Sequence, residues 1–194
     1  PRGREAIVPD IATFKRNWEI FTHGILANIN WSGIIAAGGS VQACFLVCFL
    51  ADLSSEALFP YRPLQIILRL YHSPAEVLAG FDIDAACFAF DGNKVWTNPR
   101  GIAACIRRCN TVDLSRRSPS YESRLSKYAR RGFEILLPSL HRGRIDEAAV
   151  RHRYFFFPNG LARLLVLEKM SEDPKFYKYL PPHSLRLGEP TNDR

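Results

Sequence analysis

Hydrophobic side chains recur at helical spacing near the start of the chain. Phe14, Trp18, Phe21 and Ile25 are three or four residues apart, and Asp10 precedes them as a residue suited to cap exposed backbone N–H groups. This pattern predicts an amphipathic first helix. Its aromatic stripe is expected to face the core of the protein rather than a ligand.

A short apolar run that ends in glycines follows. Residues 33–37 form the run, Gly38, Gly39 and Ser40 come next, and an apolar, helix-like segment continues over 41–50. This order predicts a strand, a glycine turn and a helix. Adjacent glycines let the backbone approach a ligand, and the first amides of a helix attract anions, so the turn is a candidate phosphate site. The same turn also occurs as an ordinary connection, and both interpretations stay open.

The middle of the chain alternates strand and helix signals. The β-rich run 64–70 predicts a largely buried strand, and Ser73 and Glu76 form a capping box at the start of a short helix that stops at Gly80. A second strand is expected from 81 to 90, followed by a turn at 91–92 and a return strand over 93–97.

Two carboxylates lie at alternate positions of that second predicted strand. Because side chains alternate across a strand, Asp82 and Asp84 are expected to project from one face. Paired carboxylates are candidate ligands for Mg²⁺, and the same pair also fits a solvated strand edge.

Helices dominate the later part of the chain. The pattern predicts a helix over 99–108, a short strand or turn at 111–114, and a helix from about 118 to Gly132. That last helix turns Tyr121, Leu125 and either Tyr128 or Ala129 inward, and a basic stripe lies on its other face: Arg124, Lys127 and Arg131. A strand over 133–138, a buried strand at 154–157 and a helix over 161–170 complete the expectation.

These elements predict an α+β fold, with a mixed β-sheet flanked by helices and a helical C-terminal part. With 194 residues the chain is long enough for one sizeable core. We expect one α+β domain over 1–138 and a basic extension over 139–194 that packs on it, with the linker at 138–144.

Composition narrows the classes of partner and compartment. A net charge of +7 favours polyanions such as RNA, although many basic proteins bind no nucleic acid. Five cysteines among apolar neighbours favour buried thiols in a reducing compartment, cytoplasmic or nuclear, over disulfides or zinc. The longest apolar stretch is shorter than a membrane span, so no membrane partner is expected. The start without Met suggests a processed chain or the edge of a longer protein.

Several segments together resemble a known family. The resemblance spans residues 12 to 150 and is carried by 14–46 with its Ala-Ala-Gly-Gly-Ser-Val turn, by 60–92 with Gln-Ile-Ile-Leu-Arg-Leu and Gly-Phe-Asp-Ile-Asp, and by 120–133. These segments resemble the polymerase-beta-like nucleotidyltransferase-fold domains found in fungal, protist and large-virus proteins, often near ankyrin repeats. The resemblance implies phosphoryl transfer with Mg²⁺ and a nucleoside triphosphate.

The chain departs from that family at its main metal ligands. Family members place a Ser-Asp-hydrophobic-Asp strand between the glycine turn and the Gln-Ile-Ile-Leu-Arg segment. Here the interval 41–64 contains Asp52 and Glu56, which do not have that spacing. With that pair missing, Asp82 or Asp84 would correspond to the third carboxylate strand of the family, which alone is not expected to hold two metals. One alternative is that Asp82 and Asp84 have become the metal pair, with Asp113 as a third acid. Another is that the sequence lacks a loop present in the natural protein.

Two functional hypotheses follow from the resemblance. In the first, a transferase moves a nucleoside monophosphate from a nucleoside triphosphate to a hydroxyl of RNA, protein or a small molecule. Its assigned residues are Asp82, Asp84 and Asp113 for Mg²⁺, and Gly38, Gly39, Ser40, Lys127 and Arg131 for the triphosphate. In the second, the chain is a catalytically inactive nucleotidyltransferase-like module that binds RNA or a protein partner within a larger assembly.

Overall fold

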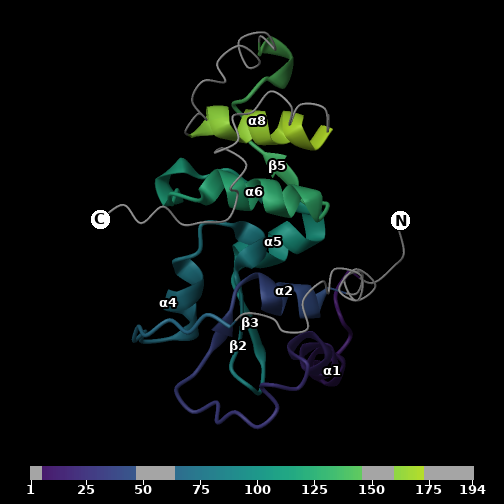
Figure 1. Cartoon of the computed structure of the whole chain (residues 1–194), viewed down its shortest axis with the longest axis vertical. Helices are drawn as coiled ribbons and strands as arrows, with labels where there is room; N and C mark the ends of the chain where they lie inside the picture. Colours follow the sequence, from purple (N-terminus) through teal and green to yellow (C-terminus); the bar gives the residue numbers. More distant parts are fainter. Residues whose placement is uncertain (1–5, 47–63, 146–159, 173–194) are drawn as a thin grey trace. The chain divides into compact units, whose positions relative to one another are not determined.

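The computed structural model describes residues 6–46, 64–145 and 160–172. These residues belong to two compact units, which divide between Cys109 and Asn110. This division falls earlier in the chain than the linker expected at 138–144. The described residues contain helices and two small sheets, which confirms the α+β class (Figure 1). None of the helices in the described ranges combines the length and the apolarity needed to cross a bilayer.

The first unit contains a three-stranded antiparallel sheet. Its strands are β1 (Ala36–Ala37), β2 (Phe88–Phe90) and β3 (Val95–Thr97), in the order β1-β2-β3. Ala89 lies opposite both Ala37 and Trp96, so β2 is the central strand. All three residues of β2 are buried, as expected of a strand with neighbours on both sides.

The hairpin expected at Asp91-Gly92 is confirmed between β2 and β3. The Asp91 carboxylate accepts hydrogen bonds from the amides of Asn93 and Lys94, at 2.8 Å each, and from the indole nitrogen of Trp96 at 2.7 Å. Gly92 has a φ of +88°, which favours glycine. A side chain there would also collide with the Trp31 ring. The hydrogen bonds of Asp91 and the backbone conformation of Gly92 therefore stabilise this hairpin.

Among the described residues of the first unit, the α-helices beside the sheet are α1 (Ile11–Thr22), α2 (Gly39–Phe45), α4 (Pro74–Ala79) and α5 (Pro99–Arg107). The predicted caps are present. Asp10 accepts from the amide of Thr13 at 2.7 Å, and Ser73 accepts from the amide of Glu76 at 3.3 Å. Both bonds satisfy amides that a helix leaves unpaired at its start.

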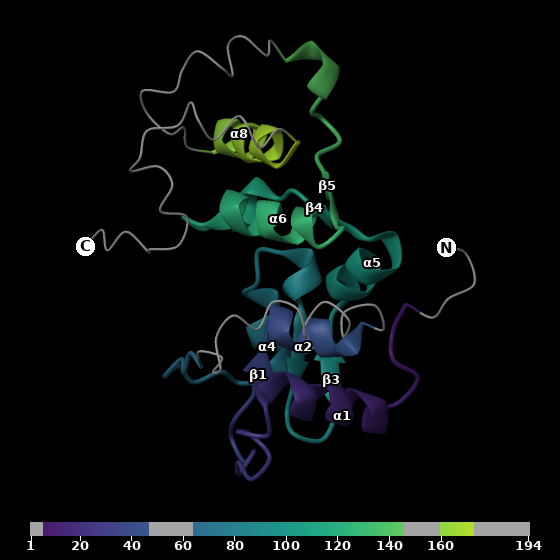
Figure 2. The same ribbon diagram turned by 45° about the vertical axis from the view of Figure 1, so that its right-hand side comes forward.

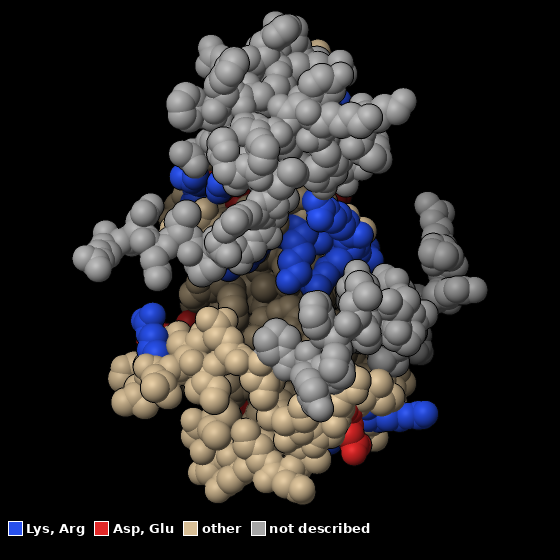
Figure 3. All heavy atoms as spheres, viewed as in Figure 1, with Lys and Arg blue, Asp and Glu red and all other residues tan. Residues whose placement is uncertain are grey.

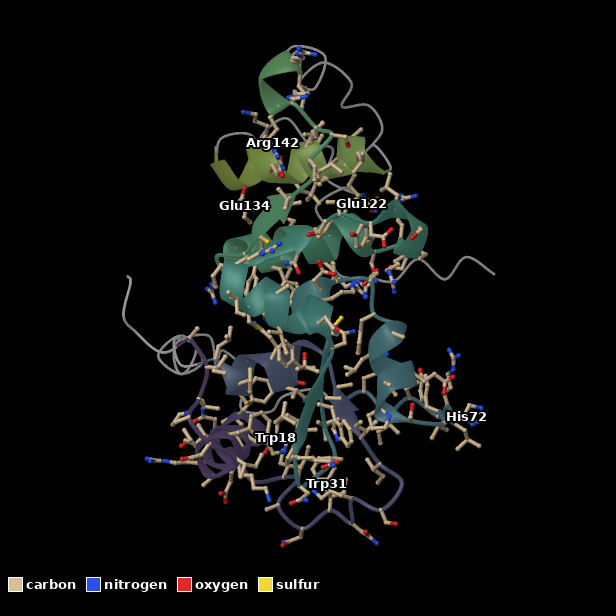
Figure 4. The ribbon with its side chains drawn as sticks, turned by 180° about the vertical axis from the view of Figure 1, so that it is seen from behind. Trp18, Trp31, His72, Glu122, Glu134 and Arg142 are labelled. Carbon is tan, nitrogen blue, oxygen red and sulfur yellow. The ribbon has the colours of Figure 1, made fainter. Side chains whose placement is uncertain are left out.

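The core of the first unit is partly aromatic. Phe14 and Trp18 of α1 contact Phe90 of β2, with ring centroids 4.9 and 5.6 Å apart. Trp31 also contacts Phe90, at 5.1 Å, and lies near Trp18 in Figure 4. The aromatic stripe of α1 therefore faces the core, as its spacing predicted.

In the second unit, the described residues form two α-helices and a two-stranded sheet. Helices α6 (Tyr121–Arg130) and α8 (Leu161–Glu172) pack on each other, and β5 (Glu134–Leu136) pairs with β4 (Cys109–Thr111), which begins at the last residue of the first unit (Figure 2). Short 3₁₀ turns lie at Leu114–Arg116 and Arg142–Arg144. The buried side chains include those expected from α6, with Tyr128 inward and Ala129 exposed: Tyr121, Leu125, Tyr128, Leu164 and Leu167.

Several expected strands are wrong or shorter than expected. Residues 64–70 form no strand and are exposed, and no described strand pairs with them. The strand expected over 81–90 is reduced to β2, since a 3₁₀ turn at Asp84–Ala86 interrupts it. The run 33–37 contributes only β1. Residues 47–50 of the second predicted helix and the strand expected at 154–157 lie outside the described residues.

Candidate functional site

The diglycine bend connects β1 to α2. Gly38 has a φ of +101° and caps α2, and its N–H donates to the carbonyl of Phe88 in β2 at 2.8 Å. A Cβ atom at Gly38 would lie 3.8 Å from the Phe81 ring, so the backbone there passes close to the residue that precedes Asp82. Gly39 and Ser40 form the first turn of α2. The bend is therefore fixed against β2 and against the start of the aspartate segment.

Asp82 and Asp84 lie in a turn rather than in a strand, so strand alternation does not determine where their side chains point. Both are buried, with exposed fractions of 4% and 9%. Asp84 begins the 3₁₀ turn that leads into β2. The two residues are close in space because they are close in sequence.

Arg100 holds this turn. From the first turn of α5 its Nε donates to Oδ1 of Asp84 at 2.7 Å. The same guanidinium donates to the carbonyls of Phe81 at 2.9 Å and Asp82 at 3.3 Å. A planar guanidinium with five N–H donors can hold a carboxylate and two carbonyls together in this way. The sequence interpretation did not name Arg100. The available signal was its position directly after the Asn98-Pro99 helix start, which places its side chain in the first turn of α5.

Asp113 belongs to the second unit. Its carboxylate accepts from the hydroxyl and the amide of Ser115, at 2.5 and 3.0 Å, and from Nε of Arg116 at 3.0 Å. The hydrogen bonds from Ser115, with a smaller contribution from Arg116, lower the pKa of Asp113 below its usual value. The carboxylate thus caps a 3₁₀ turn. Across the described ranges no three metal-ligating His, Cys, Asp or Glu side chains gather in one place.

Basic residues are concentrated at the C-terminal end of α6. Lys127 and Arg130 are exposed there, and the Arg131 guanidinium lies 5.5 Å from the centre of the Tyr128 ring. We call Lys127, Arg130 and Arg131 the basic end of α6. The sequence interpretation named Lys127 and Arg131 but missed Arg130, which the i, i+3 spacing from Lys127 places on the same surface.

Near the start of α6, two arginines are hydrogen-bonded within the second unit. Glu122 is fully buried, and its Oε1 accepts from Nε of Arg117 at 2.5 Å. Arg124, which was expected to belong to the basic stripe, donates to the hydroxyl of Ser118. Figure 4 shows Glu122 on the ribbon of the second unit, and Figure 3 shows broader areas of Lys and Arg than of Asp and Glu on the drawn face. Lys127 and Arg130 are thus the basic side chains of α6 that are exposed, whereas Arg124 is partly buried.

The described cysteines are buried thiols. Cys44, Cys87, Cys105 and Cys109 form no disulfide with one another. Burial raises the pKa of the Cys105 thiol to about 11, with smaller opposing effects from Arg108 and Gln42. A thiol with so high a pKa is a poor nucleophile and a poor metal ligand near neutral pH, because both roles require the thiolate.

The chain is similar to part of a longer viral protein. The chain is 42% identical over 116 residues to a protein of Acanthamoeba polyphaga mimivirus described as uncharacterized protein R883. The match covers 55% of this chain and 26% of the viral protein, so the chain corresponds to about a quarter of that protein's length. No family model matches the chain, and no solved structure matches it.

Proposed function

We propose that this chain is a divergent, catalytically inactive nucleotidyltransferase-like module that binds RNA. The ion pair of Arg100 with Asp84 supports the inactive part of the proposal, because a guanidinium already occupies the carboxylate that a catalytic Mg²⁺ would need. Arg100 also binds the Phe81 and Asp82 carbonyls, which makes this turn a packed structural element. A metal site requires carboxylates open to the cation and its waters.

The observation that carries the RNA part is the basic end of α6. Residues 110–145 and 160–172 contain ten Lys or Arg against five Asp or Glu, an excess of five positive charges. Three of the acids are held in ion pairs with Arg116, Arg117 and Arg142. Exposed Lys127 and Arg130 therefore lie in a positive field, which attracts phosphate groups and releases their counterions.

The test is the salt dependence of binding to a fluorescent single-stranded RNA of about 20 nucleotides, a length that spans several ssRNA contact sites. Replacing two phosphate-contacting cations is expected to weaken binding about tenfold and to lower the slope of log K against log salt by about 1.4. The variant is Lys127→Ala/Arg130→Ala. Its matched control is Lys15→Ala/Arg16→Ala, which removes two positive charges, also exposed, from α1 in the first unit.

Two results would oppose the proposal. Equal losses in both variants would mean that only net charge matters, and an affinity independent of salt would mean that phosphates are not bound. For the inactive part, the expected result is no Mg²⁺-dependent transfer of label from any of the four nucleoside triphosphates to RNA. Transfer that stops in Asp82→Asn would establish the enzyme instead.

One observation favours that second candidate, a Mg²⁺-dependent nucleotidyltransferase. The diglycine bend lies against Phe81, so a nucleotide held by Gly38, Gly39 and Ser40 would be near the Asp82 segment. This candidate predicts tight binding of a Mg²⁺–nucleotide complex in calorimetry.

We place the protein in a reducing intracellular compartment, cytoplasmic or nuclear, and its buried thiols support this location.

A further inference from the structure

The apolar segment 64–70 is the most exposed hydrophobic stretch among the described residues of the first unit. Five of its seven residues are large and apolar. Their exposed fractions are 57% for Leu64, 81% for Ile66, 67% for Ile67, 96% for Leu68 and 98% for Leu70. Scattered apolar residues are normal on a surface, but a contiguous set of this kind marks an interaction site.

The backbone of this segment also has open hydrogen-bonding groups. Its one local bond joins the N–H of Arg69 to the carbonyl of Ile67 at 3.0 Å, and within the described part of the chain the backbones of 64, 66, 68 and 70 make none. In an extended strand, alternate residues direct these groups to the same edge. Within the described part of the chain the edge of 64, 66, 68 and 70 has no partner strand. The Arg69–Ile67 bond lies on the other edge and closes a three-residue turn at Leu68, which opens when the segment extends to pair.

We propose that this segment is a self-association site, at which two copies of the chain pair residues 64–70 as antiparallel strands. The two-fold axis passes through Ile67, which lies opposite its counterpart. Leu64 then faces Leu70, Gln65 faces Arg69, and Ile66 faces Leu68. This interaction involves only residues of the first unit and does not depend on the proposed RNA binding.

The partner is identified by the complementarity of the segment with itself. In this register every apolar side chain faces an apolar one, and the single charge, Arg69, faces the amide of Gln65. Moving the axis to Leu68 places Arg69 opposite Ile67, and moving it to Ile66 places Gln65 opposite Ile67. Parallel, in-register pairing places Arg69 beside Arg69. Each alternative makes a mismatched or repulsive cross-strand pair, and the antiparallel register about Ile67 makes none.

The side chains on one face of the paired strands are all apolar. Alternation puts 64, 66, 68 and 70 on this face, and the two copies together join them into one continuous apolar ribbon. A contact of seven residues per chain is smaller than a standard protein interface. The dimer is therefore weak and reversible, and its population rises with protein concentration.

The first experiment measures mass by sedimentation equilibrium under reducing conditions, from about 5 to about 500 µM, a range suited to a small interface. The wild-type chain is expected to pass from monomer to dimer. In Ile66→Lys/Leu68→Lys the introduced charges face each other across the strands, which should raise the dissociation constant at least about tenfold. The control Ile102→Lys/Ile106→Lys adds the same charge to exposed isoleucines of α5 and should leave the dimer intact.

The second experiment traps the register with a disulfide. At the axis, Ile67 forms a pair without backbone hydrogen bonds, in which the Cα atoms are about 4.5 Å apart and within reach of a disulfide. Mild oxidation should therefore cross-link Ile67→Cys into a dimer. Leu70→Cys should not cross-link, because position 70 faces position 64. Wild-type chain is the blank for its native cysteines.

The two experiments give different results depending on whether the proposed dimer forms. A mass that stays monomeric at every concentration overturns the proposal, including the case in which another protein covers the segment. A dimer that survives Ile66→Lys/Leu68→Lys, or equal cross-linking of Ile67→Cys and Leu70→Cys, also overturns it. Circular dichroism of each variant confirms that a lost dimer is not a lost fold. Concentration-dependent dimerisation with selective cross-linking at Ile67 supports the proposal.

Discussion

Arg100 offers the sharpest test of how the aspartate segment is stabilised. The change Arg100→Met keeps an apolar stem of similar length but removes the guanidinium, leaving the Asp84 carboxylate without the cation 2.7 Å away. Breaking a buried ion pair costs about 3–5 kcal/mol. The side chains of Arg100 and Asp84 keep 25% and 12% of their surface exposed, so water offsets part of the loss and we expect about 3 kcal/mol. For a chain of this size the melting temperature should fall by about 6–12 °C.

The assay is urea unfolding followed by circular dichroism, with Asp84→Asn/Arg100→Met as the partner variant. Removing both charges leaves no uncompensated ion, so the double variant should recover about 1–2 kcal/mol relative to Arg100→Met. A loss below about 0.5 kcal/mol in Arg100→Met would refute the structural role of the pair, since surface substitutions change stability by that much.

The same variants test the inactive assignment of the site. Without Arg100 the Asp84 carboxylate no longer has a competing cation, so a metal that belongs there would bind more readily. A ligand that binds only the folded state raises its stability. We expect Mg²⁺ to leave the melting temperature of Arg100→Met unchanged. Stabilisation by Mg²⁺ in Arg100→Met but not in the double variant would show a cation site and contradict the inactive module.

Three further predictions concern local structure. Asn98→Ala removes the side chain that accepts from the first turn of α5 and should cost about 1 kcal/mol in urea unfolding, whereas Asn98→Asp should keep most of it. Burial raises the pKa of Asp91, but hydrogen bonds from the Lys94 amide and the Trp96 indole outweigh burial, so the net pKa is lowered. The contribution of Asp91 to stability is therefore complete above the usual pKa of 3.8 and is lost as the pH falls below that value. Asp91→Asn should therefore flatten the acid limb of a plot of unfolding free energy against pH. With the Cys105 pKa near 11, a thiol reagent at about pH 8 should label Cys105 only after unfolding in guanidinium, which mass spectrometry of the labelled peptide checks.

Features decided by neighbouring residues were predictable from the sequence. Asp10 and Ser73 cap helices through bonds that span three residues, and Asp91 organises its turn through the next few residues. The inward face of α6 follows from helical periodicity alone. In each case the partner lies within one or two turns of the chain, so the pattern contains both members of the interaction.

Features that depend on residues distant in the sequence were not predictable from the sequence alone. The composition of 64–70 favours a strand, but a strand forms only when another strand accepts its hydrogen bonds, and no described strand pairs with these residues. The role of Asp84 depends on Arg100, sixteen residues away, which alternation within a single segment cannot reveal. An acid whose partner is present, such as Asp84, becomes part of the fold, whereas a strand-forming segment that has no partner among the described strands can pair with a second copy.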